Sequence, residues 1–417
     1  MSLWRMAWRY LWGRAFVTIL TVIGIVLGAA LIVTVLTLQR ESKTGFLNEG
    51  GQFDLVVGAK GSPLQLVLSS IYHLDSPTGN IPYARFSALA QDARIASAVA
   101  LGLGDNYHGY RIVGTDTNLF SLPDRRDPKK LLFNLSEGTL FQKDFEAVVG
   151  AQVASQTGLK RGDTFVGTHG LTVTPGTSEH HAFPYTVVGI LAPSGSSSDN
   201  AIYVTLPSVW RIHEKEAETH RQIAGVAPNA PPSTKDLEVT AVLLRLKTVG
   251  LRLLMSQEIQ KQTEAMAAIP VNEMLRLYQQ VLRPMQLLLL AVAALVVIVS
   301  ALSITATLYQ AAERRRRDLA VLRALGAHPR EIFTLVVLEA LLVTVLGLAT
   351  GWLLGHGGLA LALPYFRDSL GISLSPWMSD RVEVLSLGLV ALGGLLAGIL
   401  PAAQAYRREA VTDLSST

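Results

Sequence analysis

Long apolar runs separated by polar chain are the dominant pattern of this sequence. Residues 15–38 contain no charged side chain, and further runs of spanning length follow at about 285–309, 332–354 and 384–405. As a helix rising ~1.5 Å per residue, the first run reaches roughly 34 Å, and a hydrocarbon core is about 30 Å thick. The pattern therefore predicts an α-helical integral membrane protein with four transmembrane helices.

A polar stretch without any run of spanning length separates the first two apolar runs. Between residues 39 and 284, short β-branched segments alternate with helical segments and Gly/Pro turns, which is typical of a water-soluble α+β domain. Residues 250–283 read as a helix that returns to the membrane, broken near Ile269-Pro270. The expected strands are Phe53–Val57, Ser97–Leu103, Gly109–Gly114, Ala147–Gly150, Tyr185–Leu191, Ala201–Thr205 and Val239–Leu246.

The distribution of basic residues predicts the orientation in the membrane. Segments expected inside are rich in arginine, whereas the loop 365–383 carries only Arg367 and Arg381. Because short cytoplasmic loops are enriched in Lys and Arg, both termini are expected in the cytoplasm and residues 39–284 outside it. The basic residues at the termini are Arg5, Arg9, Arg14, Arg407 and Arg408.

The expected domains follow from spans and orientation together. They are 1–38 for an N-terminal interfacial helix and the first span, 39–284 for an extracytoplasmic domain with a stalk, and 285–417 for three spans, a cytoplasmic segment at 310–331 and a cytoplasmic tail. Within the first of these, Trp4, Trp8 and Trp12 recur every four residues, which suits a helix lying at the headgroups. A plain extension of the first span is the alternative.

A charged amphipathic segment from Glu313 to Glu331 lies between the second and third spans. Arg314 to Arg317 are four consecutive arginines, which places the segment at the cytoplasmic face. Three leucines and a glycine recur at helical spacing and form one apolar face, with an acid and a base at its margins. These residues are Leu319, Leu322, Leu325 and Gly326, flanked by Asp318 and Arg323. A basic loop that only fixes topology is the alternative interpretation.

The string ERRRRDLAVLRALGA in this segment, followed by an apolar helix that carries Glu339, resembles the signature of FtsX/MacB-type ABC transporter permeases. This is the type VII, or mechanotransmission, class. The resemblance implies that the segment docks on a separate ABC ATPase subunit of the LolD/MacB type, which binds ATP and Mg²⁺. The coupling residues that it implies are Glu313, Asp318, Leu319, Leu322, Arg323, Leu325 and Gly326.

The outer domain and the tail carry further parts of this resemblance. Tyr110–Asp116, Val148–Phe165 and Tyr185–Leu191 resemble, in order, the periplasmic core domain of MacB-type permeases. That likeness implies two lobes, an α/β lobe built from both ends of the domain and an inserted, mostly β lobe from its middle. The tail Tyr406–Val411 resembles the family's C-terminal motif but has Ala410 where proline is usual.

The resemblance leaves two functions open. The chain is either a permease for export or extraction of a substrate (lipid or lipoprotein, peptide, drug, haem or metal complex), or a non-transporting regulator of the FtsX type. The large outer domain favours the permease. The implied partners are a second permease copy, as a homodimer or with a related permease, membrane lipid of the bacterial inner membrane, and a periplasmic adaptor or substrate-binding protein.

Composition and short motifs limit the functional classes to which the chain can belong. Mean hydropathy is +0.34 with 49% hydrophobic residues, which fits a chain that is part membrane and part soluble. The net charge of +4 gathers beside the apolar runs, so it indicates lipid headgroups and not nucleic acid. There is no cysteine, no G-x-x-x-x-G-K-[ST] loop and no G-x-S-x-G motif. The sequence thus predicts a non-catalytic subunit with no cofactor of its own.

Glycines repeat every four residues in three of the apolar runs, which lets helix backbones approach closely. The predicted packing residues are Gly24, Gly28, Gly347, Gly351, Gly355, Gly394 and Gly398. Because four spans bury little within one chain, these faces are also expected to hold the two copies of a dimer together.

Two sets of polar residues carry alternative chemistry. Glu339 lies deep in the third span with no second acid or lysine in the spans, so a structural, hydrogen-bonded role is favoured over a proton relay. In HEKEAETH, His213, Glu216 and His220 share one helical face and could bind zinc together with His180 and His181. A charged, solvated helix is the alternative, favoured because no strict metal motif is present.

Overall fold

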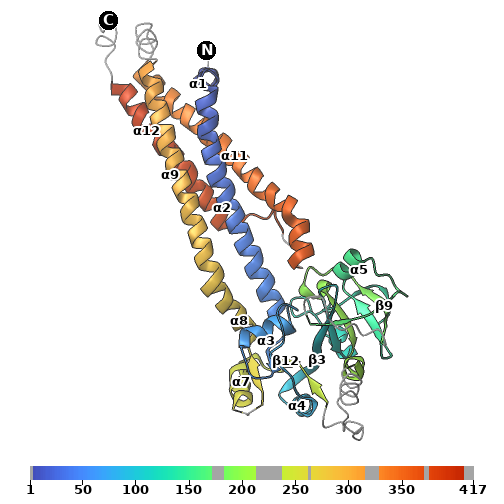
Figure 1. Ribbon diagram of the computed structural model, residues 1–417. Helices are drawn as coiled ribbons and strands as arrows, with labels where there is room; N and C mark the ends of the chain where they lie inside the picture. The colour runs from blue at the N-terminus through green and yellow to red at the C-terminus, as the bar shows by residue number, and fades with distance from the viewer. Residues whose placement is uncertain are drawn as a thin grey trace. The chain divides into compact units, whose positions relative to one another are not determined.

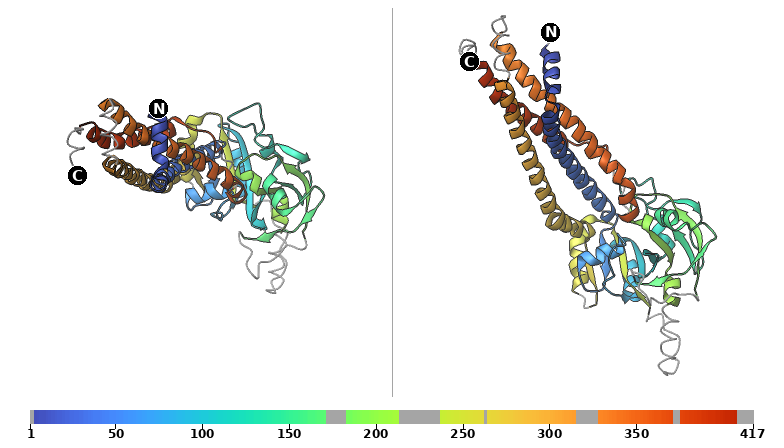
Figure 2. Two further views of the ribbon diagram at one scale, coloured as in Figure 1. Left: turned by 90° about the horizontal axis from the view of Figure 1, so that it is seen from above. Right: turned by 45° about the horizontal axis from the view of Figure 1, so that its top comes forward.

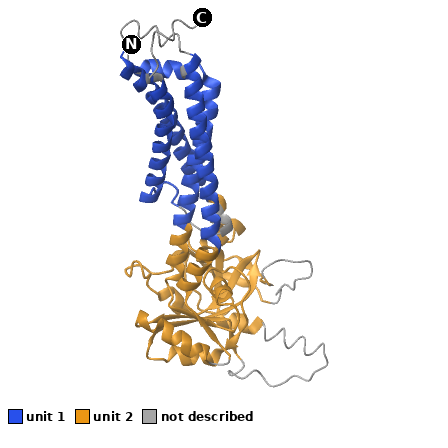
Figure 3. Ribbon diagram, turned by 90° about the vertical axis from the view of Figure 1, so that its left-hand side faces the viewer, with its two compact units in different colours: residues 1–41, 281–363, 374–417 blue, residues 42–280, 364–373 orange. Residues whose placement is uncertain are grey.

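The structure is a computed structural model that describes residues 3–170, 183–212, 237–261, 264–314, 328–370 and 375–407. The chain divides into two compact units (Figure 3). The helical unit comprises residues 1–41, 281–363 and 374–417, and the α+β unit comprises residues 42–280 and 364–373. Each is described separately below.

Long helices make up the helical unit (Figure 1). They are α1 (Leu3–Trp12), α2 (Ala15–Gly50), α9 (Arg283–Arg314), α11 (Pro329–Leu370) and α12 (Arg381–Arg407). Four helical stretches in the described residues are long and apolar enough to cross a membrane: Ala15–Gly50, Pro270–Ala311, Pro329–Tyr365 and Arg381–Gln404. The four predicted spans are therefore confirmed. Each is longer than the predicted apolar run, because the helix continues past one or both ends of that run.

The α+β unit is built on one sheet path whose order is β13-β1-β12-β3-β4-β10-β6-β9-β5. The strands on this path are β1 (Leu55–Gly58), β3 (Ile95–Tyr107), β4 (Tyr110–Thr115), β5 (Leu135–Gly138), β6 (Glu146–Val149), β9 (Tyr185–Leu191), β10 (Ala201–Thr205), β12 (Ala241–Leu246) and β13 (Met266–Ala268). Four short strands accompany them: β2 (Ile81–Pro82), β7 (Thr164–Phe165), β8 (Thr168–His169) and β11 (Glu238–Val239).

Helices cover this sheet and connect its strands (Figure 2). The α-helices are α3 (Pro63–Ser70), α4 (Tyr83–Ala90), α5 (Ala151–Thr157), α7 (Arg252–Gln260) and α8 (Pro270–Leu277). Short 3₁₀ turns are η1 (Thr117–Ser121), η2 (Ser197–Asn200) and η4 (Val249–Leu251), and a π-helical turn, η5, covers Tyr278–Leu282. Ser62 caps α3 by accepting the Gln65 N–H at 3.3 Å, with Pro63 in the first helical position.

The long strand β3 joins two halves of the sheet. Its first part, up to Leu101, pairs with β12, and its second part, from Gly102, pairs with β4 on both sides of an irregularity between Leu103 and Asn106. The strands β1, β12 and β13 come from the beginning and the end of the α+β unit's sequence, and they lie together on one side of β3. Strands from the middle of the segment lie on the other side. This is the division that the resemblance implied, with β3 shared by both halves.

A buried ionic network ties the beginning of β1 to distant segments. The Asp54 carboxylate is fully buried and accepts from Arg125 at 2.9 Å, from Arg252 at 2.5 Å and from the Leu246 N–H at 2.7 Å. Burial alone would raise the pKa of Asp54, but these hydrogen bonds outweigh it and hold the pKa below its ordinary value. Arg245 adds donors to the carbonyls of Gln52 and Pro123.

One prediction about the stalk was wrong. A helix was expected over residues 250–283, broken near Ile269-Pro270. The structure has α7, then the strand β13, then α8 in this region. Met266, Ala267 and Ala268 pair with β1 and form the edge of the sheet. The break before Pro270 is present, but pairing with a distant strand, which no local pattern shows, decides the conformation of the residues before it.

Candidate functional site in the membrane helices

The predicted ATPase-coupling segment lies mostly outside the described residues. Glu313 is exposed in the last turn of α9, while Asp318, Leu319, Leu322, Arg323, Leu325 and Gly326 fall in the gap from 315 to 327. The helix that follows, α11, starts at Pro329. The Glu331 carboxylate accepts the His328 N–H at 3.0 Å, which satisfies a donor at the helix start.

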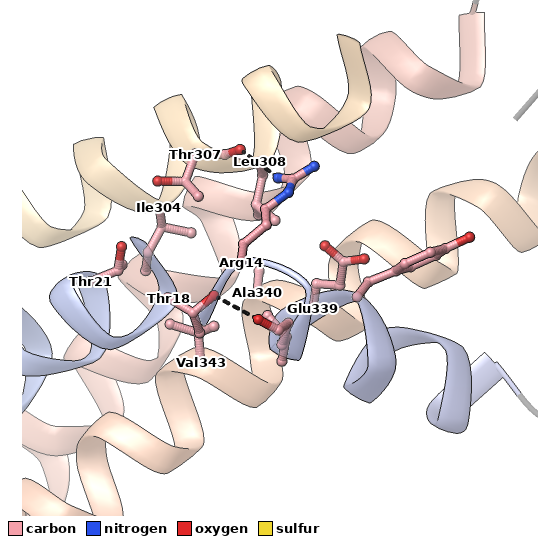
Figure 4. Close-up of a pocket in the computed structure, with 11 residues that line it drawn as sticks. Arg14, Thr18, Thr21, Ile304, Thr307, Leu308, Glu339, Ala340 and Val343 are labelled. Atoms are coloured by element: carbon pink, nitrogen blue, oxygen red, sulfur yellow. Dashed lines mark hydrogen bonds between the residues drawn. The ribbon is translucent and has the colours of Figure 1, made fainter. Parts of the chain in front are cut away.

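Close to these ends, a small cavity is enclosed by α1, α2, α9 and α11 (Figure 4). Its volume is about 20 Å³. Its lining residues are Tyr10, Leu11, Arg14, Thr18, Thr21, Ile304, Thr307, Leu308, Glu339, Ala340 and Val343. A space of this size holds about one water molecule and excludes any organic cargo. It is therefore a small gap between packed helices.

Glu339 and Arg14 both line this cavity (Figure 4). Glu339 is 3% exposed, and Arg14 donates from Nη1 to the Thr307 carbonyl at 3.4 Å. An ionisable side chain inside a membrane is costly unless protein surrounds it, and Glu339 is buried among the residues that line this cavity, Arg14 included. The sequence analysis did not place Arg14 at this cavity, because that arginine was counted with the basic headgroup segment.

Several hydroxyl side chains of these helices donate to backbone carbonyls. Thr18 donates to the Leu11 carbonyl at 3.3 Å and Thr21 to the Val17 carbonyl at 2.9 Å. Thr305 lies 3.0 Å from the carbonyls of both Ala301 and Ala397, the second of which belongs to α12. Because lipid offers no hydrogen-bond partners, these bonds let hydroxyl groups remain within the membrane.

The glycine faces of α2 and α11 meet other helices of the same chain. A Cβ added at Gly24 or Gly28 would lie 2.5 Å from Ser300 Oγ or 2.7 Å from Val297 Cγ2, both on α9. A Cβ at Gly351 would lie 2.6 Å from Ala29 Cβ on α2. A Cβ added at Gly347 or Gly355 would likewise come too close to Ile25 or Val33, which also belong to α2. These separations are too short for any side chain, so the helices are packed backbone to backbone.

The glycines of α12 also contact their own chain. A Cβ at Gly398 would lie 2.5 Å from Ala340 Cβ, and one at Gly394 would lie 2.7 Å from Thr344 Cγ2, both on α11. The expectation that the glycine faces hold two copies of the chain together is therefore wrong. All seven glycines are used within one chain, and a dimer interface would need another surface.

The N-terminal helix α1 is separate from α2, with Gly13 and Arg14 between them. Its Ala7 is fully buried against Leu335 and Leu342 of α11. The three tryptophans predicted for the headgroup region, Trp4, Trp8 and Trp12, are all exposed. This arrangement fits the interfacial helix better than a plain extension of the first span, because the chain breaks before α2 begins.

A buried histidine–glutamate pair was missed by the sequence reasoning. His356 of α11 is fully buried, and its Nε2 lies 2.9 Å from Oε1 of Glu383 at the start of α12. The same Oε1 accepts from Trp352 Nε1 at 3.2 Å and from Ser379 Oγ at 3.0 Å, and His356 Nδ1 bonds to the Pro376 carbonyl. The pair thus fastens α11, residues 376–379 and α12 together.

A signal for this pair was present in the sequence. His356 is the one histidine in the apolar run that follows Glu339. Asp380 precedes Glu383 by three residues, which is the spacing of a helix cap. Asp380 indeed accepts the Glu383 N–H at 2.8 Å. The pairing of the two residues is a tertiary contact and could not be predicted from either segment alone.

The candidate zinc ligands His180, His181, His213, Glu216 and His220 all lie outside the described residues. Among the residues that are described, no group of three or more His, Cys, Asp or Glu side chains is arranged to hold a metal ion. The zinc hypothesis therefore stays untested.

Comparison with known families tests the resemblance. Residues 18–246 match the family described as MacB-like periplasmic core domain, and residues 290–410 match the family described as FtsX-like permease C-terminal. The chain belongs to the MacB/FtsX-like permease family. The predicted resemblance and fold class are thus confirmed. The protein is a multi-pass membrane protein with a MacB-like core domain between its first and second long apolar helices.

Curated relatives carry both an ATP-binding and a permease function in their names. The pyoverdine export ATP-binding/permease protein PvdT of Pseudomonas fluorescens is 23% identical over 423 residues, which cover 98% of this chain and 58% of PvdT. The macrolide export ATP-binding/permease protein MacB of Nitrosomonas europaea is 22% identical over 437 residues, 99% of this chain and 59% of MacB. The chain thus spans less than three fifths of the length of these relatives.

Two solved structures show a weaker likeness. The periplasmic region of MacB from Actinobacillus actinomycetemcomitans is 8% identical with a TM-score of 0.32, covering 54% of this chain and 94% of that one. The extracellular domain of the noncanonic ABC-type transporter YknZ from Gram-positive bacteria is 9% identical with a TM-score of 0.28, covering 52% and 98%.

Proposed function

We propose that this chain is the membrane permease subunit of an ABC transporter, which couples ATP hydrolysis by a separate ATPase subunit to motions of the MacB-like domain. The proposal rests on two matched regions that occur together in this sequence and on one motif that is missing from it. An FtsX-like region and a MacB-like core domain occur together, while no Walker-type phosphate loop is present. The names of the relatives pair such a permease with an ATP-binding function.

The contact with the ATPase is proposed at the segment between α9 and α11. Leu319, Leu322 and Leu325 recur at helical spacing and are proposed to form an apolar face that enters a groove on the ATPase, while the arginines around them would keep the segment at the cytoplasmic surface. The Tyr406–Val411 tail is proposed to contribute to the same contact. This assignment places both termini in the cytoplasm and the MacB-like domain outside a bacterial inner membrane.

PvdT is named for pyoverdine export and the relative from Nitrosomonas for macrolide export. We propose that this chain likewise serves export or extraction of a substrate, which would be a lipid, lipoprotein, peptide, drug, haem or metal complex, by motion of the MacB-like domain. We further propose that two copies of the permease assemble with the ATPase.

One substitution tests the coupling proposal. Leu322→Asp would bury an unpaired charge at the proposed contact, with a penalty of several kcal/mol. We expect the variant to insert normally but to lose the ATPase during co-purification and to lose stimulation of ATP hydrolysis. The measurement compares ATPase recovery and activity for wild type, Leu322→Asp and a chain truncated after Ala405.

The matched control neutralises Arg314 to Arg317 together. Because these arginines fix orientation, this variant should disturb topology, read from reporter fusions at Ser178 and Thr417, which should lie in opposite compartments. If Leu322→Asp keeps full ATPase recovery and activity, the segment is a topogenic loop and the coupling proposal is wrong.

A further inference from the structure

The last turn of α2, from residue 42 onward part of the α+β unit, contacts a serine-rich turn of the same unit. This turn, Ser194–Asn200, closes on Asp199, whose carboxylate accepts from the Ser194 N–H at 3.0 Å, the Ser194 hydroxyl at 2.9 Å and the Gly195 N–H at 2.8 Å. On its other side the turn abuts Gly150, where a Cβ would overlap the Asp199 carbonyl. The turn is therefore held in a single conformation.

Glu49 of α2 reaches this turn at Ser197. Its Oε1 accepts the Ser197 N–H at 2.8 Å and is also in hydrogen-bond contact with the Ser197 hydroxyl. The same hydroxyl lies 2.6 Å from the carbonyl oxygen of Ile71. Ser197 is 8% exposed, so water has little access to its hydroxyl group.

Counting hydrogens shows which protonation state fits this geometry. A serine hydroxyl has one hydrogen, and the Ile71 carbonyl can only accept. If Ser197 donates to Ile71, its contact with Glu49 requires a hydrogen on the Glu49 carboxyl. An ionised Glu49 would compete with Ile71 for the single hydroxyl hydrogen, and one buried acceptor would lose its donor.

The electrostatic surroundings act in the same direction. Burial raises the pKa of Glu49 to about 7, against the lowering effect of the Ser197 hydrogen bonds. The charged groups that face it are Asp199, which raises its pKa, and Arg126, which lowers it. Burial also raises the pKa values of the neighbouring Tyr72 and Tyr203, so both phenols are neutral and contribute no charge.

We propose that Glu49 is a proton-binding site and that its protonated form latches the last turn of α2 to the Ser194–Asn200 turn. Ser197 lies in the turn that leads into β10, which belongs to the middle half of the sheet. The latch therefore joins a helix that begins as a membrane span to that half of the domain. Its use in transport rests on the proposed function, whereas its existence does not.

The direction of the pH effect follows from linkage. A carboxyl whose pKa is raised in the closed state favours closure at low pH and loses that preference as pH rises. With a pKa of about 7 when closed and 4.5 when open, the opening equilibrium should rise about tenfold between about pH 6 and about pH 8.

Hydrogen–deuterium exchange of the full chain in nanodiscs tests this. Protection of peptides covering Ser194–Asn200, corrected for intrinsic exchange, should fall about tenfold over that pH range in wild type. Glu49→Gln, which keeps the acceptor and supplies a donor to Ser197, should stay protected at both pH values. Ser197→Ala should be less protected at both. Glu137→Gln, at an exposed carboxylate on β5, is the matched control and should behave like wild type.

A wild-type profile without pH dependence, or a Glu49→Gln variant that keeps it, would overturn the proposal. Should that variant fail to fold, infrared titration of wild type decides: a protonated carboxyl band disappearing near pH 7 supports the latch, and loss of all such bands below about pH 5 contradicts it. No ATPase or substrate is present in either measurement, so failure here leaves the proposed function untouched.

Discussion

Glycines allow the closest approaches between helices in the helical unit, whereas the α+β unit closes around the buried Asp54 with two arginines. Gly351 meets Ala29, and Gly398 meets Ala340. In the other unit, Asp54 gathers Arg125, Arg252 and the Leu246 N–H. The two units thus use different interactions at their closest contacts.

The surrounding solvent explains this difference. Lipid tails are as apolar as leucine, so helices in a membrane gain little from burying large apolar side chains and associate through close packing instead. In water, burial of apolar strands drives folding, and a buried charge is tolerated only when it is fully paired. The helical unit should therefore be sensitive to side-chain size, and the α+β unit to loss of charge pairing.

The largest effect is expected for Asp54→Asn. Removing the carboxylate leaves Arg125 and Arg252 partly buried without their counter-charge, a loss of about 3–5 kcal/mol. Thermal unfolding of the α+β unit within the full chain should shift down accordingly. Asp127→Asn is the control, because Asp127 pairs with Lys130 at 3.4 Å on the surface and such pairs contribute roughly 0–1 kcal/mol. Equal shifts for the two variants would refute the role of Asp54.

A smaller loss is expected for Gly351→Ala. The added Cβ would lie 2.6 Å from Ala29 Cβ and 2.8 Å from the Val26 carbonyl, so α11 and α2 must separate. Overpacking of this kind costs about 1–3 kcal/mol. Gly358→Ala on the same helix meets no atom within 4 Å and should not destabilise the protein. Fluorescence-detected thermal stability in detergent compares the two. If Gly358→Ala is the more damaging, the packing argument fails.

The smallest effect is expected for the charges at the membrane cavity. Arg14 and Glu339 line one cavity, so we expect their side chains to be energetically coupled. In a cycle of Arg14→Gln, Glu339→Gln and the double variant, the double variant should be more stable than the sum of the singles by about 0.5–1 kcal/mol. Simple additivity would show that the two charges do not interact.

Local patterns predicted much of the fold. Apolar runs of spanning length gave the four long helices, and alternation gave β9 and β10 with the bounds that the structure has. Length and periodicity are properties of a segment by itself, so they are visible in its sequence. Strand β13 was missed because its three residues, Met266 to Ala268, carry no pattern of their own and owe their conformation to β1.

The candidate site was predicted less completely. Glycine spacing indicated close helix approach but not which helix is approached, so the contact between Gly351 and Ala29 within one chain was taken for a dimer face. The pairing of His356 with Glu383, and the approach of Arg14 to the cavity of Glu339, join residues far apart in sequence. Such contacts depend on how helices are arranged, which periodicity does not specify.

The central claim is that ATP hydrolysis on the ATPase moves the MacB-like domain through this chain, and one distance measurement tests it directly. The chain has no cysteine, so Glu137→Cys introduces one spin label per copy into the domain. In the complex with its ATPase in nanodiscs, the label-to-label distance between two copies should change when ATP is added and should not change in Leu322→Asp. A wild-type distance distribution that is identical with and without ATP would contradict the account.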